Sequence, residues 1–220
     1  VVRCALSWAC WKTYVGRPET DTIRVLAMEA LGNGLNVARH HEVALSVQEA
    51  QLSFWRRLNV PQEQLLIVQG NIANTYHSLS RFDEALRLRQ EVYSGHLILN
   101  GNEHYDTLRE ANNYASLLGL LDRFEEAKAL LRKTMPVARR VLGENDETTL
   151  KMRGCYATVL YTDADATLDD LREAVTTFED IARTTRRVLG GAHPYTVRNE
   201  DSLRLARAAL RARETPSSSA

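Results

Sequence analysis

Apolar side chains recur along the chain at the intervals typical of amphipathic helices that come in pairs. An apolar stripe with i, i+3, i+7 and i+10 spacing consists of Leu108, Ala111, Ala115 and Leu118. A short polar turn follows at residues 122–124, and a second apolar stripe then extends over residues 125–142. The pattern therefore predicts two helices joined by a tight turn, each with one apolar face.

This helix pair is repeated along the sequence. Residues 81–86 read RFDEAL and residues 123–128 read RFEEAK, which is a spacing of 42 residues. The surrounding positions recur with the same spacing: Asn71, Ala73 and Ala85 correspond to Asn113, Ala115 and Ala127. A fixed period of about 20–50 residues is the signature of stacked supersecondary units. We therefore predict an all-α array, in which Ala73, Ala115 and Ala157 lie where neighbouring helices approach closely.

Three threonines set the repeat boundaries. Thr107 and Thr149 are 42 residues apart, whereas Thr149 and Thr196 are 47 apart, so we assign a five-residue insertion to a longer turn near 162–170. We expect Gly143 and Gly190 to end helices in the left-handed conformation. The predicted division is the second helix of a preceding repeat at 1–15, a degenerate repeat 1 at 16–59, repeat 2 at 60–101, repeat 3 at 102–143, repeat 4 at 144–190, a closing helix at 191–213 that begins near Pro194, and a disordered tail at 214–220.

Composition narrows the function classes. Lys plus Arg equal Asp plus Glu at 28 each, so no global field favours nucleic acid or an anionic membrane. The three cysteines form no CxxC pair and leave one thiol over under any disulfide scheme, which favours a reducing compartment. We therefore expect a cytoplasmic protein, and we interpret the Arg pairs 139–140 and 186–187 as complements of helix dipoles.

The motifs resemble tetratricopeptide repeats, which share two-helix units, a small residue midway along the first helix and an F-x-E-A start to the second. The period, the NNYA phrase at 112–115 and an LG pair followed by HPYT at 193–196 resemble the kinesin-light-chain type, over roughly residues 17–210. The resemblance implies a right-handed superhelical solenoid of antiparallel two-helix repeats. It also implies an inner surface lined by the first helices, and partners that are proteins or peptides rich in acidic residues and Trp.

Groove-facing positions follow from placing Ala115 at the midpoint of its helix. The position two residues after the threonine marker is basic in four of five units, with Ile67 as the exception. Asparagine side chains nearby can pair with the main chain of an extended peptide. The predicted peptide-binding residues are Arg24, Asn71, Asn74, Arg109, Asn112, Asn113, Ser116, Lys151 and Arg198. The alternative is that these cations are solvated or paired with neighbouring acids such as Glu110.

Other chemistry is not predicted. Asn74, Asn113 and Lys151 partly match the clamp by which chaperone-binding relatives hold a C-terminal carboxylate, but Gly70 and Cys155 replace a Lys and an Arg. We interpret Cys155 as a small groove-facing residue rather than a nucleophile. The histidines at 40, 41, 96 and 104 lack the spacing of metal ligands. Trp8, Trp11 and Trp55 are expected in the core or in the packing between repeats, rather than on a stacking platform. We therefore expect no catalytic site, no metal and no cofactor.

Two functions remain. The first is a non-catalytic scaffold that binds an extended, acidic peptide segment in its concave groove. The second is a structural or self-association module, or the sensor arm of a larger NTPase-linked protein. Exposed apolar faces at the ends of an array would favour self-association.

Overall fold

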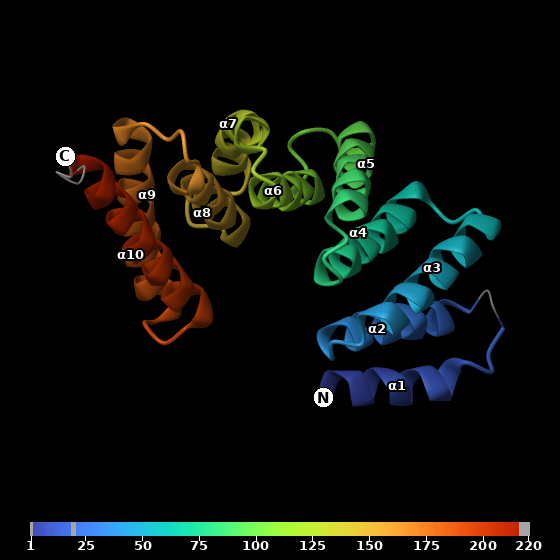
Figure 1. Ribbon diagram of the computed structural model, residues 1–220. Coiled ribbons are helices and arrows are strands. Elements are labelled where there is room, and N and C mark those ends of the chain that lie inside the picture. Colours follow the sequence, from blue (N-terminus) through green and yellow to red (C-terminus); the bar gives the residue numbers. More distant parts are fainter. Residues whose placement is uncertain (1, 19–20, 216–220) are drawn as a thin grey trace. The chain divides into compact units, whose positions relative to one another are not determined.

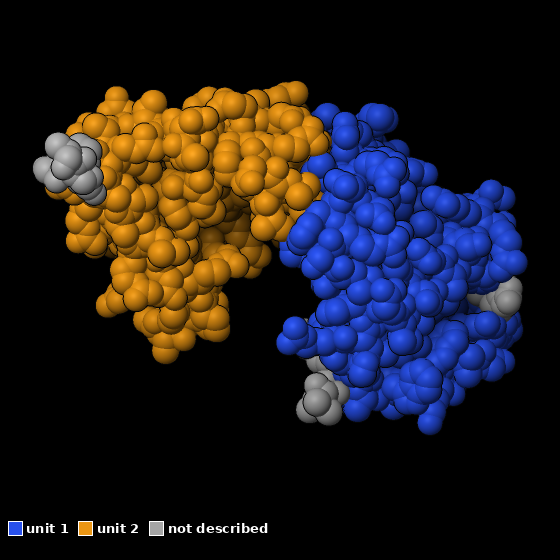
Figure 2. Space-filling view, viewed as in Figure 1, with its two compact units in different colours: residues 1–99 blue, residues 100–220 orange. Residues whose placement is uncertain are grey.

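The computed structural model describes residues 2–18 and 21–215, and all regular structure in these residues is α-helical. The chain divides into two compact units, residues 1–99 and 100–220, which Figure 2 shows in different colours. Unit 1 contains α1 (Val2–Tyr14), α2 (Thr22–Val37), α3 (His41–Arg57), α4 (Gln62–Ser78) and nearly all of α5 (Phe82–Asn100). Unit 2 contains α6 (Tyr105–Leu120), α7 (Phe124–Val141), α8 (Glu147–Thr162), α9 (Leu168–Leu189) and α10 (Pro194–Glu214) (Figure 1). The predicted all-α class is confirmed.

Many buried apolar residues among the described part of unit 1 belong to two clusters. Helix α2 packs against α1, α3 and α4, and α3 also packs against α4. One cluster joins Leu31, Leu35 and Ala44 to the partly buried Cys4 and Trp11. A second cluster consists of Leu45, Trp55, Val68 and Ile72. Trp55 and Trp11 thus belong to the core as predicted.

The expectation that Trp8 is a core residue is wrong. Trp8 is 47% exposed and its ring lies beneath the ammonium of Lys12, 5.7 Å from the ring centroid. The two residues lie four apart on α1, so the cation covers an indole face that no apolar cluster buries.

A core cluster in unit 2 contains buried residues from each of the helices α6 to α10. Each of its helices packs against the next, and the first helices of successive pairs also touch, α6 against α8 and α8 against α10. The alanines on the repeat period, Ala115 and Ala157, are fully buried in this core. A Cβ added at Gly119 of α6 would lie 2.9 Å from Val159 Cγ2 of α8, so these two helices are already as close as small residues permit. The predicted role of small residues at helix crossings is confirmed here.

The turns inside the helix pairs repeat one backbone conformation. Arg39, Ser80 and Asp122 have φ values of 67°, 59° and 57°, in the left-handed region that non-glycine residues seldom adopt. Gly143 and Gly190 also have positive φ values, 97° and 85°, as predicted. With a ψ of 159°, however, Gly190 lies outside the left-handed helical well. It ends α9 in an extended conformation that glycine alone adopts readily.

The connection between α8 and α9 spans residues 163–167 and is held at both ends. Asp163 accepts a hydrogen bond from Lys128 Nζ of α7 at 2.7 Å, and its other carboxylate oxygen accepts from the Asp165 N–H. At the other end, Thr167 and Asp170 form a reciprocal capping box at the start of α9. Ala166 between them is only 2% exposed. This longer turn is therefore part of the packed structure of unit 2.

Helix α10 closes unit 2. Pro194 stands in its first turn, where its missing N–H costs nothing, and the His193 side chain accepts a hydrogen bond from the Tyr195 N–H. The helix continues to Glu214. Residues 216–220 of the predicted tail lie outside the described residues.

Candidate peptide-binding face

Three cations occupy one register on the first helices of unit 2. Arg109, Lys151 and Arg198 are each the fifth residue of their helix, in α6, α8 and α10 respectively. Because α6 packs on α8 and α8 on α10, residues in the same register form a row across the three helices. We call these three residues the basic row.

Two members of the basic row already have anionic neighbours on their own helix. Arg109 pairs with Asp106 Oδ1 at 2.7 Å and with Glu110 Oε1 at 3.1 Å. Lys151 Nζ lies 2.6 Å from Glu147 Oε1, and this hydrogen bond lowers the pKa of the Glu147 carboxyl below its usual range. Pairing with neighbouring acids, the alternative considered for these cations, thus occurs at both positions.

Arg198 is placed differently. Its guanidinium lies over the Tyr195 ring, 5.1 Å from the centroid, in a cation–π contact three residues apart on α10. The side chain is exposed, and no carboxylate is paired with it among the described residues. Arg198 is therefore the member of the basic row with the least compensated charge.

Three polar residues of α6, Asn112, Asn113 and Ser116, follow Arg109 along the helix. Asn113 is half-buried and Ser116 is exposed, directly beside the fully buried Ala115. The Asn112 Oδ1 atom is buried and has no hydrogen-bond partner among the described residues.

The predicted residues of unit 1 form a separate set. Arg24 is half-buried and donates from Nη1 to the Arg17 carbonyl at 2.8 Å. On α4, Asn71 is half-buried, while the Asn74 side chain accepts a hydrogen bond from Arg89 of α5. Ile67 is 41% exposed, and it occupies the position of its repeat at which the repeats of unit 2 have a cation. The α4 surface thus combines amides with an apolar side chain.

Catalytic and metal chemistry find no support in the described residues. Burial raises the pKa of the Cys155 thiol to about 12, so at neutral pH this side chain is a thiol and not the nucleophilic thiolate. No group of three or more His, Cys, Asp or Glu side chains in the described part of the chain could hold a metal ion. Over the same residues, no helix has both the length and the apolar character needed to cross a membrane.

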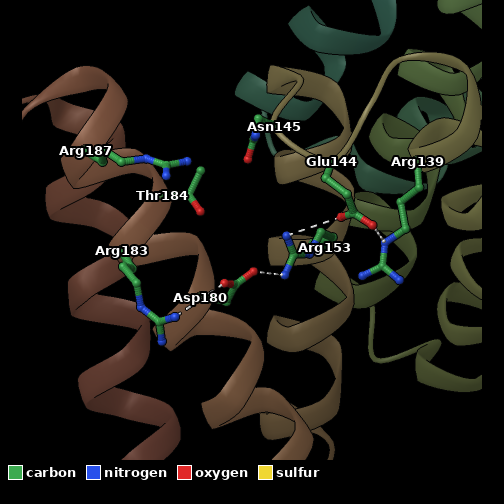
Figure 3. A pocket seen from close by; sticks show the side chains of 8 residues that line it. All are labelled: Arg139, Glu144, Asn145, Arg153, Asp180, Arg183, Thr184 and Arg187. Carbon is green, nitrogen blue, oxygen red and sulfur yellow. Dashed lines mark hydrogen bonds and ion pairs between the residues drawn. The ribbon is translucent and has the colours of Figure 1, made fainter.

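Sequence reasoning missed one site, a pocket of about 530 Å³ that Figure 3 shows from close by. It collects residues from positions 139 to 187, which only folding brings together. Two of them, Arg139 and Arg187, belong to the Arg pairs interpreted as complements of helix dipoles. The only sequence signal for the pocket is the recurrence of these pairs at the ends of α7 and α9.

Comparisons with known proteins agree with this architecture. Residues 65–106 and 107–147 match the family model of the tetratricopeptide repeat. BtubC (BKLC) from P. vanneervenii has a similar structure, with a TM-score of 0.67 and 16% identity over 100% of this chain and 95% of that one. The nearly identical TPR-like repeats of a Podosopora anserina protein assigned as a kinesin light chain reach a TM-score of 0.68 at 17% identity, over 92% of this chain and 100% of that one.

A third similar structure is that of Bacillus thuringiensis PlcR in complex with the peptide PapR7 and DNA. Its TM-score is 0.62 at 16% identity, over 87% of this chain and 68% of that one. At such identities the likeness concerns the fold. No curated protein matches the chain significantly.

The chain is thus an all-helical solenoid built from antiparallel two-helix units. Residues 65–147 match the tetratricopeptide repeat, and the fold is similar to that of the kinesin-light-chain-like repeat structures, as the sequence motifs predicted.

Proposed function

We propose that this protein is a non-catalytic interaction scaffold that binds an extended acidic segment of a partner protein. The observation that carries the proposal is the basic row. Its three cations repeat in one register of α6, α8 and α10, and neighbouring members are one repeat apart. Adjacent packed helices are about 8–10 Å apart, so carboxylates spaced along one extended peptide can reach successive members of the row.

The acids beside Arg109 and Lys151 weaken this attraction without abolishing it. The side chains of these two cations are 40% and 43% exposed, and their partners are near neighbours on the same helix. The pairs of Arg109 with Asp106 and of Lys151 with Glu147 are partly or fully exposed, and such pairs stabilise a protein by about 0–1 kcal/mol, so exchanging either carboxylate for one of the peptide costs little. Glu110 is only 5% exposed and would stay paired with Arg109. Arg198 has no such partner to exchange. A peptide with several carboxylates would therefore bind through the row, with an affinity that falls as salt rises.

Amide side chains would fix the peptide main chain beside the row. Asn112 and Asn113 of α6 provide donors and acceptors in unit 2, and Ser116 provides an exposed hydroxyl. Unit 1 would offer a separate set of contacts, with the amides Asn71 and Asn74 on α4 and the cation Arg24 on α2. The complex of PlcR with the peptide PapR7 supports peptide binding by a protein of this fold.

The proposal is tested by fluorescence anisotropy with a labelled Glu- and Asp-rich peptide and its Gln and Asn counterpart. We expect only the acidic peptide to bind. The double variant Arg109→Gln/Lys151→Gln should weaken this binding about tenfold or more, since each charge-assisted contact contributes about 1.5–3 kcal/mol before the native pairs are subtracted. Neutral glutamine avoids placing a new carboxylate beside Asp106, Glu110 or Glu147.

A matched control has the same loss of charge elsewhere in unit 2. Arg140 and Arg172 are exposed and ion-paired, with Glu103 and with Asp169 respectively. The variant Arg140→Gln/Arg172→Gln should bind the acidic peptide nearly as well as the unmodified protein does. Equal losses in the two double variants would mean that the peptide responds to net charge, and the basic row would not be the site.

Exposed apolar side chains favour a second candidate function, self-association. Leu6 on α1 is 65% exposed and Leu205 on α10 is 57% exposed. Sedimentation equilibrium over a range of protein concentrations separates the two functions. A mass that rises with concentration, together with no binding of the acidic peptide, would favour self-association. A constant monomer mass with peptide binding favours the scaffold.

A further inference from the structure

The pocket in Figure 3 lies within unit 2, where the end of α7, the connection to α8, and the helices α8 and α9 meet. Its volume of about 530 Å³ is in the range of small-molecule sites. Its lining contains no aliphatic or aromatic side chain. The residues that line it are Arg139, Glu144, Asn145, Arg153, Asp180, Arg183, Thr184 and Arg187.

Positive charge exceeds negative charge in this pocket. Four arginines share two carboxylates, which leaves an excess of two positive charges. Glu144 contacts Arg139 at 3.3 Å and Arg153 at 3.6 Å, while Asp180 contacts Arg153 at 2.5 Å and Arg183 at 4.0 Å. Arg187 has no carboxylate partner among the described residues, and Figure 3 shows its guanidinium pointing into the space between α9 and the α7–α8 connection.

Arg153 makes this a built site and not a chance gathering of surface charge. The residue is 8% exposed, and both its Nη atoms are ion-paired, one with Glu144 and one with Asp180. Its Nε atom is buried without a hydrogen-bond partner among the described residues. Burying a guanidinium is costly unless its charge is compensated, so both carboxylates of the pocket are held by Arg153 and compensate the other arginines less.

A neighbouring hollow of about 310 Å³ lies between α9 and α10. Arg183 lines both hollows, and in the smaller one Arg186 pairs with Glu200, Arg204 with Asp201 and Arg207 with Glu179. The arginines of the smaller hollow other than Arg183 thus have one carboxylate each, whereas Arg187 of the larger pocket has none among the described residues. The smaller hollow also contains the apolar side chains of Ala182 and Leu203. The larger pocket is therefore the stronger candidate for an anion site.

We propose that the larger pocket binds a phosphomonoester dianion. Such a group carries about −1.5 to −2 charges at neutral pH, which matches the excess of two, and a single carboxylate would leave half of it uncompensated. Planar guanidinium groups suit the paired oxygens of phosphate, and the Thr184 hydroxyl and the Asn145 amide add neutral donors. The pocket shares no residue with the basic row, so this inference does not depend on the proposed function.

The phosphate group could belong to a phosphorylated side chain of a partner protein or to a small metabolite. Isothermal titration calorimetry with the full chain distinguishes them, using inorganic phosphate, O-phosphoserine, a phosphoserine peptide and the same peptide without phosphate. We expect the phosphopeptide to bind and the unphosphorylated peptide to bind at least about tenfold more weakly, since one charge-assisted contact contributes about 1.5–3 kcal/mol. O-Phosphoserine that binds as tightly as the peptide would identify a small ligand as the source.

Paired variants place the binding in the pocket. Arg139→Gln/Arg187→Gln removes two lining charges and leaves the buried Arg153 and both of its carboxylates in place. It should weaken phosphopeptide binding about tenfold or more. The control Arg140→Gln/Arg172→Gln makes the same change on the same two helices outside the pocket, and should leave binding within about twofold. Thermal melts of both variants confirm that they are folded.

A third variant examines the buried arginine. Arg153→Lys keeps the positive charge but replaces the forked guanidinium by a single ammonium, so phosphate binding should weaken while the fold persists. Equal weakening in the pocket variant and its control would overturn the proposal. So would binding of the peptide that does not require its phosphate group, or tighter binding of a single-stranded oligonucleotide than of the phosphopeptide.

Discussion

At the scale of the residue, Ala115 and Ser116 show how sharply a helix in this array separates packing from contact with solvent. Ala115 is fully buried in the core of unit 2, and the next residue, Ser116, is exposed. Because the α6–α8 crossing has no spare space, Ala115→Leu should reduce the free energy of unfolding by about 1–3 kcal/mol. Ser116→Ala should change it by less than about 0.5 kcal/mol. Urea denaturation of both variants measures the difference, and equal midpoints would contradict it.

The turns offer a second test at this scale. Ser80 has a φ of 59°, where a residue with a Cβ is strained by about 1–2 kcal/mol. Glycine removes this strain but gains entropy in the unfolded chain, so Ser80→Gly should stabilise the protein by about 0.5–1 kcal/mol. Gln64→Gly, at an exposed position inside α4, should destabilise it by about the same amount. Chemical denaturation tests this, because the midpoint should rise for Ser80→Gly and fall for the helix variant. Lower midpoints for both variants would mean that the turn is not strained.

The sequence predicts the surroundings of a residue well when they are determined by residues close to it in the chain. Ala115 and Ala157 were predicted correctly because helix crossings recur with the repeat. The acids beside the basic row, Asp106 and Glu147, lie within one helical turn of their cations and could also have been recognised. Trp8 could not, because its exposure depends on which faces of α1 the neighbouring helices cover.

At the scale of the element, the turn between α8 and α9 depends on one ion pair. The Lys128 and Asp163 side chains are only 7% and 10% exposed. Burial alone would raise the pKa of Asp163, but hydrogen bonds from Lys128 and from the Asp165 N–H outweigh it and leave the pKa below its usual 3.8. A lowered carboxyl pKa stabilises the fold above pH 3.8, and this contribution is lost as pH falls through the folded-state pKa.

We therefore expect the Asp163→Asn variant to lose stability at neutral pH and to respond less to acid. Breaking a buried pair costs about 3–5 kcal/mol, and because Glu125 still pairs with Lys128 we expect about 2–3 kcal/mol. Below pH 4 the curves of unfolding free energy against pH should converge for the variant and the unmodified protein. Glu126→Gln, which breaks the exposed pair with Arg123, is the control and should cost less than about 1 kcal/mol. If the two curves of unfolding free energy against pH stay parallel at all pH values, the protonation of Asp163 does not affect the stability of the fold.

The sequence located this turn but could not predict how it is held. The two threonine spacings, 42 and 47 residues, placed the insertion near 162–170, and the connection lies at 163–167. Its partner Lys128 lies 35 residues earlier in the chain, at a position of α7 that the apolar pattern does not distinguish from solvent-facing ones. The spacing of the repeats and the pattern of apolar residues predict where helices begin and end. Contacts between helices that are distant in sequence require the packed structure.

At the scale of the whole molecule, both proposed sites of unit 2 arise from repetition, but in different ways. The basic row repeats one residue type in one register, so the sequence alone could predict its members. The phosphate pocket arises where the repetition is imperfect. In the repeat Arg139 corresponds to Arg186 and Arg140 to Arg187, so α7 contributes the first arginine of its pair to the pocket and α9 contributes the second. This asymmetry becomes visible only when both helix ends are seen around Arg153.

Substitutions in the basic row and in the pocket should therefore weaken the binding of different ligands. Arg109→Gln/Lys151→Gln should weaken binding of the acidic peptide about tenfold or more and leave phosphopeptide binding within about twofold, because charge-assisted contacts are local and screened beyond about 8 Å at physiological salt. Arg139→Gln/Arg187→Gln should show the reverse pattern, and Arg140→Gln/Arg172→Gln should affect neither ligand. All three variants lose two positive charges, so a general electrostatic effect would lower both affinities equally in each. If one double variant weakens both ligands while the control weakens neither, the two peptides occupy a single surface, and the row and the pocket are parts of one site.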